Sequence, residues 1–185
     1  MKTFISFENW LNEQAGKKEY GCVMLDTHIS DWKKTHLTKI DKEDLYTAED
    51  DKYGYNEQPH ITVMYGIHLD KTKPKDVIEK MKEMKQLTSE IKQISIFENE
   101  KYDVVKYDVP VTKELKKFRN IFSKFPNTQD FPDYHPHITI AYVKKGEGKK
   151  YVQKMKNPFE LTFDEATYSY NNTRKTIKLD KNNVG

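Results

Sequence analysis

A seven-residue pattern occurs twice in this chain of 185 residues. Residues 59–65 read Pro-His-Ile-Thr-Val-Met-Tyr, and residues 136–142 read Pro-His-Ile-Thr-Ile-Ala-Tyr. Alternate side chains of an extended strand point to the same face, so each copy presents one imidazole and one hydroxyl together. The two polar pairs are His60 with Thr62, and His137 with Thr139.

The doubled histidine indicates acid–base catalysis. Histidine changes its charge near neutral pH, so two imidazoles that face one another can supply a general base and a general acid. The threonine hydroxyls can hold the oxygens of an anion between them. Burying such groups without partners would cost roughly 1–3 kcal/mol per group, which favours a bound ligand as their partner. We therefore expect His60, Thr62, His137 and Thr139 to be the catalytic residues.

Two other interpretations of the repeat remain open. The first is a structural duplication that carries no chemistry. The second is a metal site, because His135 and His137 alternate on one strand and His60 could join them. Zinc prefers a third or fourth ligand with further support, and threonines are poor ligands. We therefore expect no metal and no cofactor.

The composition is that of a folded protein with a mild positive charge. Hydrophobic residues make up 36% and charged residues 33%, and 12 tyrosines and 9 phenylalanines supply bulky core material. The net charge of +3 allows an anionic partner, whereas a protein that wraps long nucleic acid is usually more basic. The single cysteine, Cys22, excludes an internal disulfide. No apolar stretch approaches the length of a membrane span, and we expect a cytoplasmic protein.

The order of predicted elements is typical of an α+β fold. Short links between strands favour antiparallel sheets, and the motif repeat favours two pseudo-symmetric lobes with helices outside and a central groove between them. Apolar spacing and turn residues place the helices at 74–87 and 112–125, with Thr112 as an N-cap. Strands are predicted at residues 20–29, 59–67, 91–97, 102–109, 136–143, 159–170 and 173–179, the last two joined by a turn at Asn171-Asn172.

These motifs resemble those of the 2H phosphoesterase superfamily, which includes RNA 2′,3′-cyclic phosphodiesterases and LigT-type 2′-5′ RNA ligases. The resemblance runs from about residue 20 to the end of the chain. It implies the bilobal fold, a metal-free reaction, His60 and His137 as the acid–base pair, and Thr62 and Thr139 as the phosphate ligands.

Within that superfamily the chain is similar to phage phosphodiesterases that destroy the cyclic oligonucleotide signals of bacterial CBASS immunity. Residues 1–13 resemble leaders of proteins packaged into the heads of T4-like phages, which are cut after a glutamate in a context that Leu11-Asn12-Glu13 fits. We thus expect a leader and linker over residues 1–18 and one bilobal domain over residues 19–185. The expected setting is an infected bacterial cell, with packaging into the phage head through the leader.

The expected substrate is a small cyclic oligonucleotide, such as a cyclic dinucleotide or trinucleotide. Alternatives are a 2′-5′ or 2′,3′-cyclic phosphodiesterase that processes RNA ends, and a protein that sequesters a nucleotide without turnover. Aromatic rings that border the groove would stack on bases, and the carboxylate of Glu165 would reach a base edge or orient a histidine. The candidate substrate-binding residues are Tyr20, Trp32, Phe97, Tyr134 and Glu165.

Overall fold

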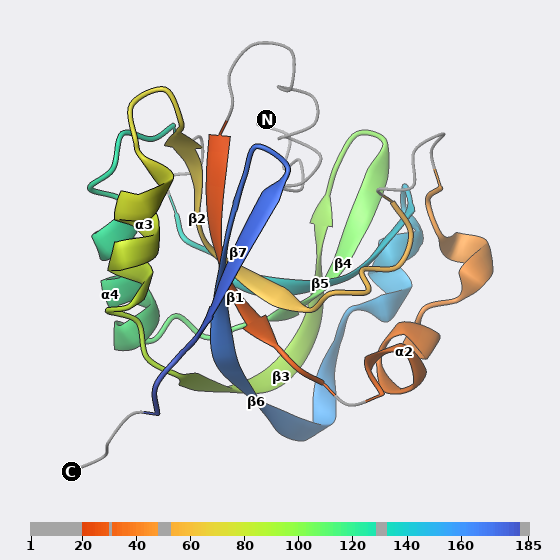
Figure 1. The fold of residues 1–185 in the computed structure, drawn as a ribbon. Helices are drawn as coiled ribbons and strands as arrows, with labels where there is room; N and C mark the ends of the chain where they lie inside the picture. Colours follow the sequence, from red (N-terminus) through yellow and green to blue (C-terminus); the bar gives the residue numbers. More distant parts are fainter. Residues whose placement is uncertain (1–19, 30, 48–52, 129–132, 182–185) are drawn as a thin grey trace.

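A single antiparallel sheet organises the chain. The computed structural model describes residues 20–29, 31–47, 53–128 and 133–181, so the expected leader over residues 1–18 lies outside the described residues. Within the described part the sheet has seven strands in the order β2-β1-β6-β3-β4-β5, and β7 pairs with β6 (Figure 1). The strands are β1 (Tyr20–Thr27), β2 (His60–His68), β3 (Leu87–Glu98), β4 (Tyr102–Asp108), β5 (His137–Lys144), β6 (Gln153–Tyr170) and β7 (Thr173–Lys178).

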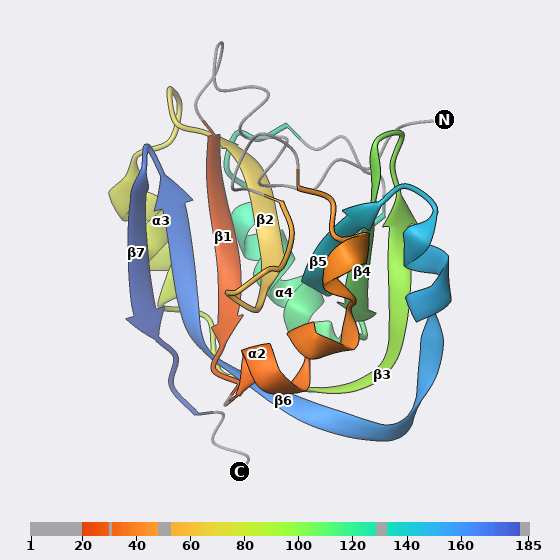
Figure 2. The ribbon, with the colours of Figure 1, turned by 90° about the vertical axis from the view of Figure 1, so that its right-hand side faces the viewer.

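The sheet bends so strongly that its two end strands meet. β2 and β5 stand at opposite ends of the strand order, yet they contact one another. The long strand β6 makes this possible because it pairs with β3 through its first part and with β1 and β7 through its last part. Figure 2 shows the result: β1, β2 and β7 stand opposite β3, β4 and β5, and β6 runs beneath both groups. We call β1, β2, β7 and the adjoining part of β6 the first half, and β3, β4 and β5 the second half.

The expected class, an α+β fold built on antiparallel sheet, is therefore confirmed. The two longer helices, α3 (Pro74–Met81) and α4 (Lys113–Phe122), contact each other and lie on one flank of the molecule (Figure 1). α3 packs against β6 and α4 against β2. The one-turn helix α2 (Trp32–Thr35) and three short 3₁₀ turns lie in the connections. Apolar side chains from both halves and from these helices form a large core. A smaller, separate cluster in the second half contains Tyr102, Val104 and Tyr142.

Each motif strand is covered along its outer edge by the chain that leads to the other motif. The segment before β2 runs along β5, with bridges from Leu45 to Val143 and from Tyr55 to Ala141. The segment before β5 runs along β2, where Asn127 bridges Ile67. An uncovered strand edge invites pairing with other chains. These two segments supply hydrogen-bond partners to the outer edges of β5 and β2, and they connect the two halves.

Two short-range predictions are confirmed. The Thr112 side chain accepts a hydrogen bond of 3.1 Å from the backbone N–H of Leu115, so it caps α4 as expected. At the turn between β6 and β7, Asn171 and Asn172 have φ angles of 44° and 60°. Two consecutive positive φ values define the hairpin turn that matches the twist of the flanking strands, and asparagine tolerates them better than most residues.

Strand lengths departed from expectation where long-range pairing decides them. The helix predicted over 74–87 ends at Met81, and Leu87 instead begins β3, where it pairs with Phe163. β6 begins at Gln153 and not at residue 159, because its first residues pair with β3. The local sequence pattern does not predict such pairings, because they depend on a strand far away in the sequence.

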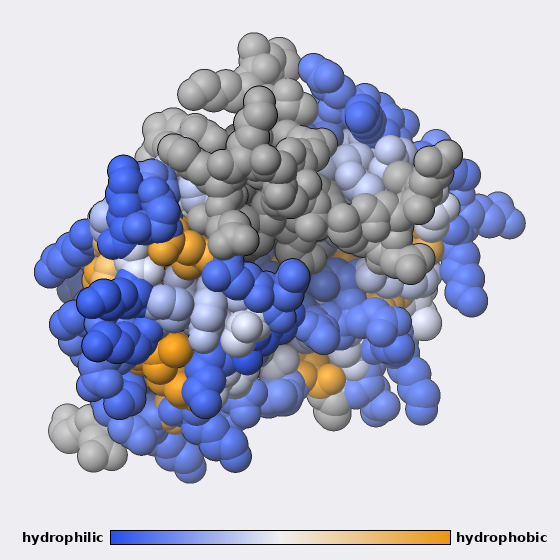
Figure 3. Space-filling model, turned by 45° about the horizontal axis from the view of Figure 1, so that its top comes forward, coloured by the Kyte–Doolittle hydropathy of each residue, from blue (hydrophilic) through white to orange (hydrophobic). Residues whose placement is uncertain are grey.

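The described residues on the face drawn in Figure 3 are mainly hydrophilic. Figure 3 shows hydrophilic side chains over most of one face, with small apolar patches between them. Within the described residues, none of the helices combines the length and the apolar character that crossing a membrane would take.

Gly66 should be irreplaceable because it allows the segment before β5 to lie close against β2. Its φ is +72°, and a Cβ built there would lie 2.2 Å from the backbone oxygen of Thr128. We expect Gly66→Ala to lower the free energy of unfolding by about 3 kcal/mol, through strain in the left-handed conformation and through this clash. Urea denaturation measures the loss.

Gly146→Ala is the matched control for the conformational part. Gly146 has φ +91°, but a Cβ there meets no described atom within 4 Å. It should cost only about 1 kcal/mol. Equal losses at the two glycines would show that the contact with Thr128 is unimportant.

Candidate active site

The two motif histidines are held in the same way. His60 opens β2 and its Nδ1 lies 2.8 Å from the backbone oxygen of Gln58. His137 opens β5 and its Nδ1 lies 2.8 Å from the backbone oxygen of His135. A carbonyl oxygen only accepts, so Nδ1–H donates in both cases and Nε2 is left to exchange a proton. A partner two residues upstream thus fixes the tautomer and the orientation of each ring.

The structure brings the two imidazoles close enough for His60 to influence the pKa of His137. Their strands contact each other, and both rings are partly exposed. Burial, together with the charge of Lys106 and the neighbouring His60, lowers the pKa of His137 to about 4, although its hydrogen bond to His135 and the charge of Asp108 act to raise it. His137 is therefore neutral at physiological pH and can accept a proton.

An aspartate stands opposite each motif histidine on the neighbouring strand. Asp26 of β1 pairs with His60, and Asp108 of β4 pairs with His137. Cross-strand partners point to the same face of a sheet, so each carboxylate lies on the face that carries the imidazole. The sequence contains both aspartates near strand ends, but only the strand pairing shows that they occupy equivalent places.

The third strand of each half completes the correspondence with a hydroxyl. Thr167 of β6 donates a hydrogen bond to Asp26. Ser95 of β3 donates one of 2.6 Å to Asp108. Both halves thus present the same series of strands. The motif strand carries His and Thr, the middle strand carries Asp, and the inner strand carries a Thr or Ser whose hydroxyl donates a hydrogen bond to that Asp. This symmetry extends well beyond the seven-residue repeat visible in the sequence.

The backbone behind each threonine is fixed from the opposite half. The amide of Asn56, just before β2, donates a bond of 3.0 Å to the backbone oxygen of Thr139. The hydroxyl of Tyr134, just before β5, donates a bond of 3.0 Å to the backbone oxygen of Thr62. Neither residue could be assigned this part from sequence, because each bond joins segments far apart in the chain.

Tyr134, expected to bind substrate, is thereby placed against β2. The guanidinium carbon of Arg119 lies 4.4 Å from the centre of its ring, and Arg119 also donates to the backbone oxygen of Val63. Burial raises the pKa of the Tyr134 hydroxyl, so it remains a neutral donor to Thr62.

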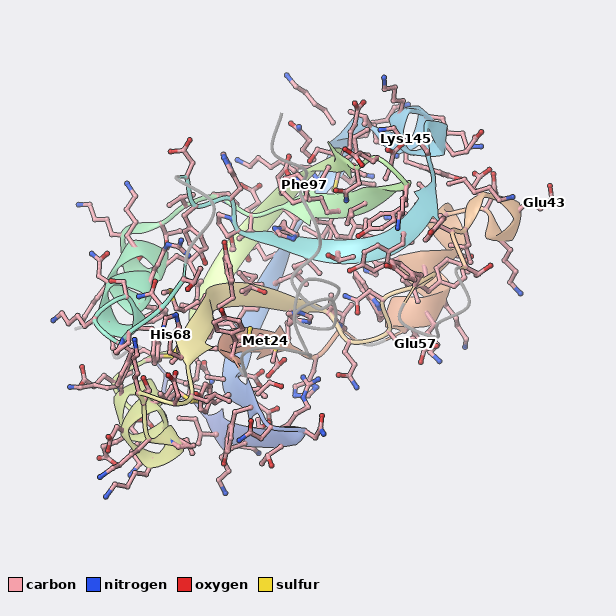
Figure 4. The ribbon with its side chains drawn as sticks, turned by 90° about the horizontal axis from the view of Figure 1, so that it is seen from above. Met24, Glu43, Glu57, His68, Phe97 and Lys145 are labelled. Atoms are coloured by element: carbon pink, nitrogen blue, oxygen red, sulfur yellow. The ribbon has the colours of Figure 1, made fainter. Side chains whose placement is uncertain are left out.

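Phe97 lies beside the second motif. Its ring meets that of His137 edge to face, with centroids 4.9 Å apart and planes at 89°. It is partly exposed at the end of β3, in the second half of the molecule (Figure 4). The structure therefore brings this candidate together with a catalytic candidate.

Glu165 lies on the histidine-bearing face of the first half. It pairs with Asp26, whereas Phe163 pairs with Thr27, and the resulting bulge sends Glu165 and Phe163 to opposite faces. One oxygen of its carboxylate lies 3.0 Å from Nε2 of His28. The bulge therefore turns Glu165 away from the buried Phe163 and toward the face that carries His60.

Tyr20 and Trp32 lie elsewhere. Tyr20 pairs with His68, at the far end of β1 from Asp26, and Figure 4 shows His68 on the side of the helices, away from Phe97. Trp32 is only 5% exposed, stacks on His36 and donates from Nε1 to the backbone oxygen of Asn56. Little of the Trp32 ring is left for a base to stack on, and through Asn56 it supports the second motif strand.

The acidic, cysteine and histidine side chains of the described residues include no group of three or more placed to hold a metal ion. His135 is exposed, and its contact with His137 is made by its backbone oxygen.

Comparison with known proteins agrees with this arrangement. A family model described as the 2′-5′ RNA ligase superfamily matches residues 25–174. The match spans most of the chain, which therefore belongs to this superfamily, the class of phosphoesterases indicated by the two motifs. A comparison with curated proteins finds no match.

Solved structures share the fold at low sequence identity. Usb1 of Kluyveromyces marxianus has 11% identity and a TM-score of 0.55, and the alignment covers 88% of this chain and 99% of that one. LigT of E. coli, solved with 3′-AMP, has 10% identity and a TM-score of 0.57, with 89% and 97% covered. A further phosphoesterase has 13% identity and a TM-score of 0.51, with 89% and 100% covered.

We expect the His137 imidazole to titrate near pH 4 in the folded protein. In urea the same resonance should titrate near the ordinary value of about 6.5. Because the folded-state pKa is the lower one, protonation opposes folding. The free energy of unfolding is therefore highest, as far as His137 is concerned, above pH 6.5. It decreases as the pH falls toward 4. NMR of the ring carbons measures both midpoints, and a folded-state midpoint above about 6 would contradict this electrostatic description.

Proposed function

We propose that this protein is a metal-independent phosphodiesterase that cleaves the 3′–5′ bonds of small cyclic oligonucleotides. The observation that supports it most directly is the matched pair of histidines. Both donate Nδ1–H to a carbonyl two residues upstream, and both leave Nε2 for proton transfer on strands that contact each other. Membership of a phosphoesterase superfamily supplies the reaction class.

The proposed step is an in-line displacement at phosphorus. One neutral imidazole removes the proton of a ribose 2′-hydroxyl, whose oxygen forms a bond to phosphorus while the bond from phosphorus to the 5′-oxygen breaks. The other imidazole, protonated, gives its proton to the departing 5′-oxygen. The ring is opened, and the new ends are a 2′,3′-cyclic phosphate and a 5′-hydroxyl. Water that attacks in the same way would hydrolyse the cyclic phosphate.

Thr62 and Thr139 would hold the phosphate during this step. Each hydroxyl lies on the same strand face as its histidine, two residues on, and each backbone is fixed from the opposite half by Tyr134 or Asn56. Hydroxyl donors that are positioned in advance stabilise the charge that builds up on the phosphoryl oxygens. General acid–base assistance contributes roughly 10²–10⁴-fold to the rate.

A small substrate is supported by several features. The basic residues are scattered, and several are in ion pairs, as Lys149 is with Glu98 and Lys150 with Asp44. Phe97 offers a ring beside His137 on which a base could stack, and Glu165 a carboxylate on the histidine-bearing face of the first half. The LigT structure holds a mononucleotide, 3′-AMP. We propose a phage setting and a role against CBASS immunity from the leader pattern, the chain length, Tyr20 at the start of the first strand and Glu165 in the penultimate strand.

Processing of RNA ends is the second candidate, since the family model is that of 2′-5′ RNA ligases and the fold is shared with LigT and Usb1. Incubation with cyclic dinucleotides, cyclic trinucleotides, 2′-5′-linked oligoadenylate and 2′,3′-cyclic phosphate ends separates the two. We expect the cyclic oligonucleotides to be linearised fastest, as resolved by chromatography and mass spectrometry. Cleavage of the last two alone would support RNA-end processing, and binding without products would support sequestration.

His60→Ala and His137→Ala should each lower kcat by about 10²–10⁴-fold. Circular dichroism should show that both variants fold, since the two rings are partly exposed. The assigned roles are wrong if the kcat of either variant stays close to that of the wild type.

His135→Ala separates this mechanism from a metal site. The substitution removes the exposed imidazole but keeps the backbone oxygen that His137 contacts. We expect near-normal turnover, unaffected by a chelator. A large loss, or a chelated enzyme restored by zinc or manganese, would favour the metal interpretation.

A further inference from the structure

The two halves differ at one position of their otherwise matched series. The residue opposite the motif threonine is Met24 in the first half, where it pairs with Thr62. In the second half it is Lys106, which pairs with Thr139. The inner strand also corresponds, because Thr167 pairs with Met24 and Ser95 with Lys106. A neutral thioether and an ammonium group therefore occupy equivalent places.

Lys106 is a buried cation in contact with the surroundings of His137. The residue is 4% exposed, its Nζ donates a bond of 2.6 Å to Ser95, and it forms an ion pair with Asp108. Its Nζ also lies 4.2 Å from the centre of the Phe97 ring, and that ring meets His137 edge to face. Burial excludes the water that would otherwise screen its charge.

We propose that Lys106 makes the two histidines unequal and so assigns their roles, with His137 as the general base and His60 as the general acid. The inference rests on the proposed phosphodiesterase function. Lys106 acts through His137, as a positioning residue that sets charge, and it need not touch the substrate.

The two aspartates do not create this difference, and Glu165, on the histidine-bearing face of the first half, adds a negative charge on the side of His60 that favours the same roles. Asp26 faces His60 as Asp108 faces His137, so the carboxylates act alike in the two halves. The charged or titratable groups that influence the His137 ring are Lys106 and Asp108 from β4 and His60 from β2. Of these three groups, only Lys106 has no counterpart beside the other histidine. A fixed positive charge disfavours the imidazolium form of a nearby histidine. A histidine that acts as general base must be neutral when the substrate binds.

With these roles the proton transfers balance. The 2′-hydroxyl proton passes to Nε2 of His137 as the 2′-oxygen bonds to phosphorus. Nε2 of His60 gives its proton to the 5′-oxygen as that bond breaks. The cycle leaves His137 protonated and His60 neutral, and exchange with water restores the starting state.

Lys106→Met tests the inference because it gives the second half the residue of the first. The titration midpoint of His137 should rise by about one pH unit, since a positive charge is lost and Asp108 loses its partner. The acidic limb of the kcat/KM profile should move to higher pH by the same amount, which is about a tenfold loss of rate on that limb.

Three further variants isolate the charge. Lys106→Arg keeps it and should keep the limb near its original pH. Lys106→Gln removes the positive charge but keeps a polar side-chain amide next to Ser95 and Asp108. It should shift the midpoint and the limb as Lys106→Met does, and it serves as the test if Lys106→Met folds poorly. Lys144→Met removes an exposed lysine from β5 itself and should change neither the midpoint nor the limb.

The outcomes distinguish the inference from the function on which it rests. An active wild-type protein whose acidic limb and His137 midpoint stay unmoved in both Lys106→Met and Lys106→Gln overturns the role of Lys106. A wild-type protein that turns over none of the nucleotides overturns the proposed function. In that case the NMR midpoint still decides whether Lys106 holds His137 neutral.

Discussion

The meeting of β2 and β5 is the constraint on which the rest of the structure depends. These strands are the two ends of the sheet, and flat pairing would leave their histidines far apart. Contact between them requires a sheet that bends back on itself, which in turn requires a strand long enough to serve both halves. β6 meets that need with 18 residues and two register shifts within its pairings. Bulges of this kind bend a strand and increase its twist.

The same closure solves the problem of exposed edges. Each half contributes chain that covers an edge of the other: residues 45–46 and 54–56 contact β5, and residues 126–128 contact β2. Because these stretches lead directly into the motifs, the bonds that protect an edge also fix the backbone of a threonine in the opposite half. Stability of the fold and geometry of the site are therefore maintained by the same contacts, and a change in either segment acts on the far motif.

What the sequence predicts well here is local. The alternation of His60 and Thr62, the cap at Thr112 and the turn at Asn171-Asn172 each depend on a few neighbouring residues, and the structure shows all three. The positions of Asp26 and Asp108 could not be predicted, because a strand register decides which residue stands opposite a histidine. The bulge that sends Glu165 and Phe163 to opposite faces is hidden for the same reason: an alternating pattern read through it places Glu165 with the apolar residues.

A symmetric pair of histidines cannot by itself perform an acid–base reaction in one direction. Two identical imidazoles would have identical affinities for protons. The active state, with one imidazole protonated and one neutral, would then be divided equally between two forms that differ in which histidine carries the proton. A substrate without matching symmetry reacts in only one of them. A difference of one residue, Lys106 in place of a methionine, biases the proton toward one side while the shared framework of Asp, hydroxyl and backbone bonds stays intact. In the proposed mechanism, the duplication thus supplies two positioned imidazoles, and Lys106 makes one of them the base.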